Sequence, residues 1–236
     1  MLIFINPYIF SSAATTSSQY TTNGLLHYYD FANAGWGSGT TVKDLQGTVD
    51  LTINAPSGSS VQSSPPCLVC PNSSFTTYLQ NTNAFTTVSG LTAISIEVLF
   101  MAYSGSGAQY TVNLGYGVNG GVLCMNGCYD CLQQSGQFIN STTNSTVLLS
   151  PSWSHAIFVF GAGAGACKIY LNGVAQAFST TGTMTTPFSI SQMNFGQLNQ
   201  GIYGKFAMAR IYNRALTTTE ILANYASAKA GGSYGI

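Results

Sequence analysis

The feature that most constrains the fold of this chain is a period-two pattern near its middle. Between Thr92 and Ala102, every second residue is a large apolar one: Ile94, Ile96, Val98 and Phe100. The residues between them are Ser95, Glu97 and Leu99. Because successive side chains of a strand point to opposite faces of a sheet, this pattern predicts a half-buried β-strand.

Much of the remaining sequence consists of shorter segments of the same kind, separated by residues that favour turns. LLHYYDF begins at Leu25, and AIFVF and KIYLNG lie on either side of a GAGAGA sequence. Asn172-Gly173 predicts a tight turn between two strands, because both residues tolerate a positive φ. No repeat with a period of roughly 20–50 residues occurs, which argues against a solenoid or a propeller. The pattern predicts an all-β protein.

One helix is expected, close to the C-terminus. The sequence TTTE at residues 217–220 fits a capping box, in which the first threonine and the glutamate bond each other's backbone amides. Ile221, Leu222 and Tyr225 are expected to form the apolar face of this helix, and Gly231-Gly232 to end it.

Charged residues are scarce. Six Lys+Arg and six Asp+Glu make up 5% of 236 residues and give no formal net charge. This composition offers no basic surface for nucleic acid or for an anionic membrane. No apolar run reaches the roughly 18 residues of a membrane-spanning helix. A nearly uncharged surface favours association between copies, so we expect self-assembly or binding to other proteins of a particle.

Residues 1–24 are predicted to form an apolar arm and a Ser/Thr-rich linker, and residues 25–236 the folded domain. MLIFINPYIF has no basic residue at its start, and Asn6-Pro7 interrupts the apolar run, unlike most signal peptides. A signal peptide is nevertheless the alternative. Pro7 lacks a backbone donor and favours an edge position, so the arm is expected to add to a sheet edge or to a neighbouring subunit.

The six cysteines allow several interpretations. Two C-x-x-C units suggest a zinc site, but they lie much farther apart than the roughly 15–20 residues of a zinc ribbon. Local disulfides, a thiol cluster or reduced thiols are the alternatives, and no metal centre is assigned. The residues concerned are Cys67, Cys70, Cys124, Cys128, Cys131 and Cys167.

The C-terminal half carries motifs that resemble a known family. Trp153-Ser154-His155 precedes an apolar strand, and Lys168–Gly173 reads KIYLNG after a Gly-rich turn. With KFAMARIYNRALTTTEILANYA at residues 205–226, this pattern resembles the laminin-G-like branch of the concanavalin A-like lectin/glucanase superfamily. The opening GLLHYYDF and VKDLQG are also similar to the first strands of that family. The resemblance implies a concanavalin A-like jelly-roll β-sandwich of two antiparallel sheets with one short C-terminal helix.

Several residues of these motifs are expected to have structural roles. Trp153 should fill the core where a strand begins, and Tyr170 and Tyr212 should pack on alternate faces. Arg210 and Arg214 flank the last strand, where a planar guanidinium can tie the strand to the helix.

Catalytic residues are not expected. Glucanases of the superfamily place two or more carboxylates on one strand face, and retaining hydrolysis needs two of them about 5–5.5 Å apart. This chain has two glutamates, Glu97 and Glu220, and the capping box occupies Glu220. His27 and His155 have no neighbouring nucleophile motif. The aspartates are scattered singly, at positions such as Asp30, Asp44, Asp50 and Asp130.

Sugar binding needs aromatic rings beside amide or carboxylate groups. The alternative for each such residue is a cross-strand or subunit contact. The resemblance also implies calcium at the rim of the sandwich, to which Asp44 or Asp130 could contribute. The sequence has no D-x-D-type loop, which favours a capped turn as the role of each aspartate. No other cofactor is expected. The candidate sugar-binding residues are Trp36, Tyr103, Tyr116, Asn119, Tyr129 and Asp130.

These observations lead to two hypotheses. The first is a non-catalytic structural and adhesive protein of a virus particle: a capsid decoration, fibre or surface subunit located in the virion. The alternative is a secreted or cell-surface carbohydrate-binding module, with or without calcium, whose partners are cell-surface glycans. A glucanase is the weakest interpretation.

Overall fold

The computed structural model describes residues 19–31, 41–54, 59–70, 78–81, 90–103, 110–114, 121–124, 138–141, 152–161, 168–181, 193–195, 204–231 and 234–236. In these ranges the chain forms strands and one helix, α1 (Thr218–Ala230), which confirms the prediction of an all-β protein with a C-terminal helix. None of the helical residues in these ranges forms a segment long and apolar enough to cross a membrane.

The larger sheet has eight strands in the order β13-β12-β11-β7-β16-β5-β4, and β1 pairs with β16 beside β5. The longest strand, β7, lies at its centre between β11 and β16. The strands are β1 (Leu25–Asp30), β4 (Ser60–Ser63), β5 (Pro66–Cys70), β7 (Ala93–Ala102), β11 (Ser154–Gly161), β12 (Lys168–Leu171), β13 (Val174–Ala175) and β16 (Gly204–Tyr212).

A six-stranded sheet, ordered β2-β3-β6-β15-β8-β9, forms the second layer, and β10 and β14 form a separate pair. Neighbouring strands run antiparallel in each pairing that the described residues make, as a jelly-roll sandwich requires. The strands are β2 (Thr41–Val42), β3 (Leu51–Asn54), β6 (Tyr78–Asn81), β8 (Tyr110–Leu114), β9 (Gly121–Cys124), β10 (Phe138–Ser141), β14 (Phe178–Thr181) and β15 (Met193–Phe195).

The main core lies between the two sheets. It includes the apolar residues of the period-two pattern in β7, which point toward the smaller sheet. Phe31, Phe195 and Phe206 pack edge to face there, with ring centroids 5.2 Å apart for Phe31 and Phe195 and 5.9 Å apart for Phe31 and Phe206. Aromatic pairs of this geometry add to the stability that burial of apolar area supplies.

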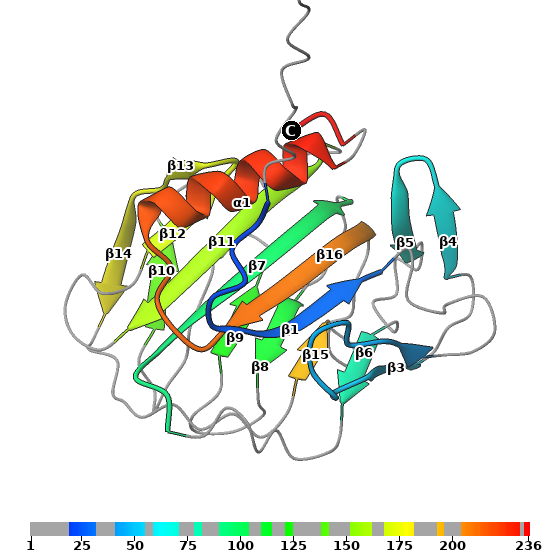
Figure 1. The fold of residues 1–236 in the computed structure, drawn as a ribbon, viewed down its shortest axis with the longest axis horizontal. Helices are drawn as coiled ribbons and strands as arrows, with labels where there is room; N and C mark the ends of the chain where they lie inside the picture. The colour runs from blue at the N-terminus through cyan, green and yellow to red at the C-terminus, as the bar shows by residue number, and fades with distance from the viewer. Residues whose placement is uncertain are drawn as a thin grey trace, which may run out of the picture.

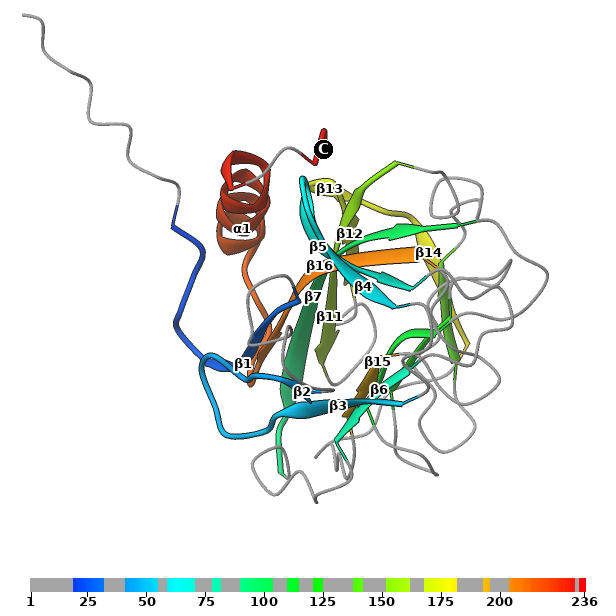
Figure 2. The same ribbon diagram turned by 90° about the vertical axis from the view of Figure 1, so that its right-hand side faces the viewer.

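α1 covers the opposite face of the larger sheet, so this sheet lies between the helix and the smaller sheet (Figure 2). As a result β7 is buried on both faces: Ser95 and Glu97 are fully buried and Leu99 is 1% exposed. The prediction of a half-buried strand was therefore wrong. The period-two pattern identifies the strand and its core face, but it does not reveal that a distant helix covers the other face.

α1 begins as predicted. Thr217 is the N-cap and accepts a hydrogen bond from the Glu220 amide, while the Glu220 carboxylate accepts one from the Thr217 amide, and Gly231 is the C-cap. The buried residues of the helix are Ile221, Asn224 and Ala228. Leu222 is 48% exposed, so its place on the apolar face was wrongly predicted. The buried stripe follows the three- and four-residue spacing from Ile221, which leaves Leu222 beside it.

Two further expectations concern the strands beneath α1. Tyr170 and Tyr212 lie in one cluster on the helix side of the sheet, together with Ile157 and Ile221, so they do not pack on alternate faces. Trp153 is buried at the start of β11, on the same side of the sheet.

The predicted tight turn joins β12 to β13. Asn172 has φ 49° and Gly173 has φ 76°. A side chain at position 173 would approach Cδ1 of Tyr225 in α1 to 2.8 Å, so glycine is needed there for both conformation and space.

Candidate functional site

A network of polar side chains lies between the larger sheet and α1. Its centre is Glu97 on β7, which is fully buried. Glu97 Oε1 lies 2.9 Å from His155 Nε2 and accepts a hydrogen bond of 3.0 Å from Arg210 Nη1. Glu97 Oε2 accepts hydrogen bonds from the Tyr212 hydroxyl at 3.1 Å and from Asn224 Nδ2 at 2.8 Å. Both carboxylate oxygens are therefore fully engaged.

The surroundings keep Glu97 ionised. Burial by itself raises the pKa of this carboxyl, but the Arg210 charge and the hydrogen bonds from His155 and Tyr212 outweigh burial and lower the pKa to about 2. Burial and the neighbouring carboxylate raise the pKa of Tyr212, which remains a donor. A general acid needs a raised pKa and access to substrate, and Glu97 has neither.

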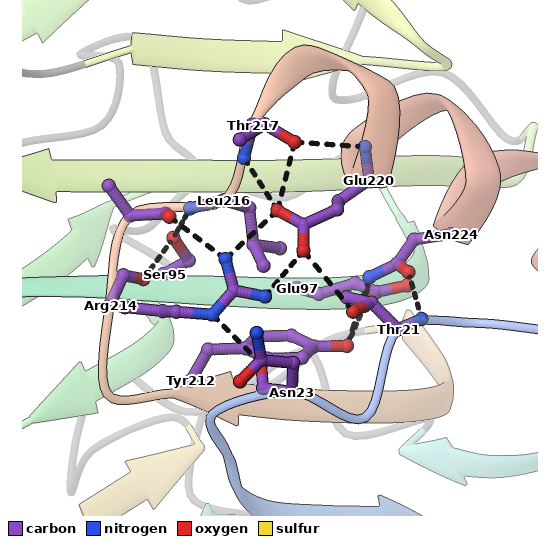
Figure 3. Close-up of polar contacts among 11 residues, drawn as sticks. Thr21, Asn23, Ser95, Glu97, Tyr212, Arg214, Leu216, Thr217, Glu220 and Asn224 are labelled. Atoms are coloured by element: carbon purple, nitrogen blue, oxygen red, sulfur yellow. Dashed lines mark hydrogen bonds and ion pairs between the residues drawn. The ribbon is translucent and has the colours of Figure 1, made fainter.

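The same region fastens α1 and the segment before β1 to the sheet (Figure 3). Arg214 Nη1 donates to Glu220 Oε2 at 2.9 Å, and Arg214 Nε donates to the Asn23 carbonyl at 2.9 Å. The Thr21 amide donates to Asn224 Oδ1 at 2.8 Å. These contacts agree with the predicted role of Arg214 in tying strand to helix.

Arg210 extends from this network toward the surface. Its guanidinium carbon lies 3.6 Å from the ring centroid of Tyr20 and 4.9 Å from that of Tyr28. Arg210 is 4% exposed, and its buried Nε has no hydrogen-bond partner among the described residues. Most buried donors are paired, so an unpaired one in a guanidinium is unusual.

A pocket of about 270 Å³ opens beside Arg210. The pocket lies along one side of β16, where two strands follow each other. β5 pairs with the first residues of β16, and β1 pairs with the last ones. Between these partners, at Phe206 to Met208, β16 shifts register against β7. α1 lies over the larger sheet beside β11 (Figure 1), and its C-terminal part contributes Ser227 and Ala228 to the pocket lining. The lining residues are Tyr20, Tyr28, Asp30, Pro66, Leu99, Ala207, Met208, Arg210, Ser227, Ala228, Gly231 and Tyr234.

The pocket combines aromatic rings with charged and apolar groups. Tyr234 donates to the Pro66 carbonyl at 2.8 Å and packs edge to face on Trp153, with centroids 4.8 Å apart. Burial, and then the charge of Asp30, raises the pKa of Tyr234 to about 12. Burial also raises the pKa of Tyr28. Both hydroxyls are therefore protonated near neutral pH, and that of Tyr234 uses its proton in the bond to Pro66.

The residues predicted to bind sugar are not brought together in the described part of the chain. Tyr103 is partly buried just after β7. Trp36, Tyr116, Asn119, Tyr129 and Asp130 lie outside the described residues.

Sequence reasoning missed the pocket residues Tyr20, Tyr28, Asp30 and Tyr234. One signal was present: Tyr28 and Asp30 alternate with the core residues of β1 and must share a face. No sequence pattern identified Tyr20 or Tyr234 as pocket residues, because they come from segments far apart in the chain that meet only in the folded protein.

The structure describes two of the six cysteines as side chains. Cys67 and Cys70 are buried and free. They are three residues apart on β5, so they point to opposite faces: Cys70 into the main core and Cys67 toward Trp153. Neither a disulfide between them nor a shared zinc ion fits this geometry. The side chains of Cys124, Cys128, Cys131 and Cys167 lie outside the described part.

Asp44 anchors a turn. Its Oδ1 accepts hydrogen bonds from the amides of Tyr28, Gln46 and Gly47, and its Oδ2 lies 2.6 Å from His27 Nδ1. Burial by itself raises the pKa of Asp44, but His27 and the amides of Gly47 and Tyr28 lower it overall. Of the two roles considered for Asp44, the geometry favours the turn over calcium binding. Among the residues that the structure describes, no three His, Cys, Asp or Glu side chains form a group that could hold a metal ion.

Comparison with known families identifies the class of protein. The family model for the concanavalin A-like lectin/glucanase superfamily, of the laminin-G type, matches residues 76–222, which is more than half of the chain. This chain belongs to that family. A comparison with curated protein sequences finds no match.

Solved structures share the fold at low sequence identity. Trypanosoma rangeli sialidase in complex with the inhibitor DANA matches with a TM-score of 0.64 and 13% identity, over 91% of this chain and 34% of the sialidase. This chain thus spans about a third of that enzyme's length. Domain 4 of the extracellular arabinanase AbnA from Geobacillus stearothermophilus, in complex with arabinotriose, matches with a TM-score of 0.63 and 16% identity, over 86% of this chain and 98% of that domain. The receptor-binding domain of botulinum neurotoxin D has a TM-score of 0.56 and 11% identity, over 86% of this chain and 52% of that domain.

Proposed function

We propose that this protein is a non-catalytic glycan-binding domain that mediates adhesion. The observation that carries the proposal is that both glutamates of the chain are ionised and engaged in hydrogen bonds. Glu97 is fully buried and accepts hydrogen bonds on both oxygens, and Glu220 caps α1 and pairs with Arg214. Glycoside hydrolysis needs one carboxyl with a raised pKa, whereas the pKa of each glutamate lies at about 2.

The comparisons support the binding half of the proposal. Two of the similar structures are described with a saccharide ligand or as a receptor-binding domain, on the same kind of sandwich. These likenesses concern the fold, and function depends on the site that a fold carries. The direct test is therefore binding itself.

The experiment combines a glycan array with a reducing-sugar assay on each glycan that binds. We expect the wild-type chain to retain glycans and to release no reducing ends, and Glu97→Gln to behave in the same way with respect to release. Release of reducing sugar by the wild type that disappears in Glu97→Gln would contradict the non-catalytic proposal. Absence of glycan binding would contradict the adhesive one.

We propose further that the domain is displayed on a virus particle. The support is compositional: a chain with 5% charged residues and no net charge is suited to burying its surface against neighbouring subunits. Light scattering after size exclusion tests this, because a subunit of a particle should self-associate, whereas a secreted module should be monomeric. Deleting residues 1–12 should weaken that association while leaving the sandwich folded. A monomeric wild-type protein would favour the secreted alternative.

A further inference from the structure

We infer that the pocket lined by Tyr20, Tyr28, Asp30, Arg210 and Tyr234 binds a single uncharged pyranose ring. This inference rests on the proposed glycan-binding function and places the sugar on the helix side of the larger sheet. None of the candidate sugar-binding residues named from the sequence is among the residues that line this pocket.

The size of the pocket suits one sugar unit. Its volume of about 270 Å³ lies just below the roughly 300 Å³ at which pockets for drug-sized ligands begin. The lining includes Leu99, Ala207 and Met208, which offer an apolar surface to the C–H groups of a sugar face. Three tyrosines in the lining add aromatic surface and hydroxyl groups.

The polar groups provide both kinds of hydrogen-bonding partner that sugar hydroxyls need. Asp30 lines the pocket with a carboxylate acceptor, and Arg210 lines it with a guanidinium donor. The Nε of Arg210 is buried without a hydrogen-bond partner among the described residues, although the side chain is held by Glu97 and stacked on Tyr20. Glu97 and Tyr20 thus hold the guanidinium in a fixed position in the pocket lining, where it can donate to a ligand hydroxyl.

The charges favour an uncharged sugar over an acidic one. The positive charge of Arg210 is already matched by Glu97, 3.0 Å away, and Asp30 adds a further negative charge to the lining. A sugar carboxylate placed here would meet an acidic side chain and a guanidinium that is already paired, so both effects oppose it.

Two variants test the site by different means. Ser227→Leu enlarges a lining residue on α1 and fills the pocket, and Asp30→Asn removes the carboxylate with little change of shape. The matched control is Ala226→Leu, which adds the same side chain at an exposed neighbouring position that does not line the pocket. The melting temperature of each variant reports folding. If Asp30→Asn does not fold, Ser227→Leu alone decides, because it keeps the helix backbone contacts.

Binding is measured by saturation-transfer NMR and calorimetry with four probes: D-glucose, D-galactose, N-acetyl-D-glucosamine and the acidic N-acetylneuraminic acid. We expect at least one uncharged probe to bind, with affinity reduced about tenfold or more by Ser227→Leu and Asp30→Asn and unchanged in Ala226→Leu. Binding that both pocket variants leave intact would overturn the pocket and keep the glycan-binding proposal. Binding of the acidic probe alone would overturn the uncharged class. No binding of any probe would overturn the pocket proposal, and the glycan array would then decide the glycan-binding proposal separately.

Discussion

The replacement Glu97→Gln should destabilise the protein strongly, although it changes only one atom and no volume. It leaves the Arg210 guanidinium buried without its counter-charge. It also turns one acceptor into a donor that faces the amide nitrogen of Asn224, whose own oxygen is already engaged by Thr21. Removing one partner of a buried ion pair typically costs about 3–5 kcal/mol.

The pKa of Glu97 gives a similar magnitude. A fall from 4.5 in the unfolded chain to about 2 in the folded protein corresponds to about 3 kcal/mol of stability at neutral pH. For a chain of this size each kcal/mol changes the melting temperature by about 2–4 °C. We therefore expect Glu97→Gln to melt roughly 6–12 °C below the wild type at pH 7 in scanning calorimetry.

The pH dependence provides the decisive check. Because the folded-state pKa of Glu97 is lowered, its contribution is complete above pH 4.5 and is lost as the pH falls toward 2. The difference in unfolding free energy between wild type and Glu97→Gln should therefore shrink over that interval. Glu220, whose pKa is also lowered to about 2, is present in both proteins and cancels. A difference that stays constant down to pH 2.5 would refute the assignment of this stability to the Glu97 charge.

Three other predictions follow from single contacts. Thr217→Ala removes the N-cap of α1 and should cost about 1 kcal/mol in urea unfolding, whereas Thr217→Ser should be nearly neutral; equal losses would show that the hydroxyl is unimportant. Gly173→Ala should lower the melting temperature more than Gly90→Ala, because both glycines have positive φ but only position 173 would place Cβ 2.8 Å from Tyr225. Burial raises the pKa of Cys67, and that of Cys70 to about 12, so iodoacetamide at pH 8 should alkylate neither thiol before unfolding, as peptide mass spectrometry would detect.

Features encoded over a few neighbouring residues were predictable from the sequence. The capping box of α1, the Asn172-Gly173 turn and the strand character of β7 each depend on local backbone preferences, and the structure contains all three. The family resemblance added the arrangement of the strands into a sandwich, since local patterns do not specify which strands pair.

What the sequence did not reveal are the consequences of α1 covering the sheet. Glu97 gave the pattern of an outward-facing polar residue, and its burial depends on a helix that begins more than a hundred residues later. The partners of Glu97 come from β11, β16 and α1, each separated from it by a long stretch of chain. No period or spacing in one segment can report such a meeting.

The same covering helix explains why the pocket and the buried network are adjacent. A charge buried as deeply as that of Arg210 must be paired, and Glu97 supplies the opposite charge. The rings of Tyr20 and Tyr28 also lie against the Arg210 guanidinium. These contacts fix the guanidinium in the lining of the pocket. A fixed donor loses little entropy when it binds a ligand, so the stabilising network also prepares the pocket for recognition. Loss of Glu97 should therefore weaken ligand binding even though this residue does not line the pocket.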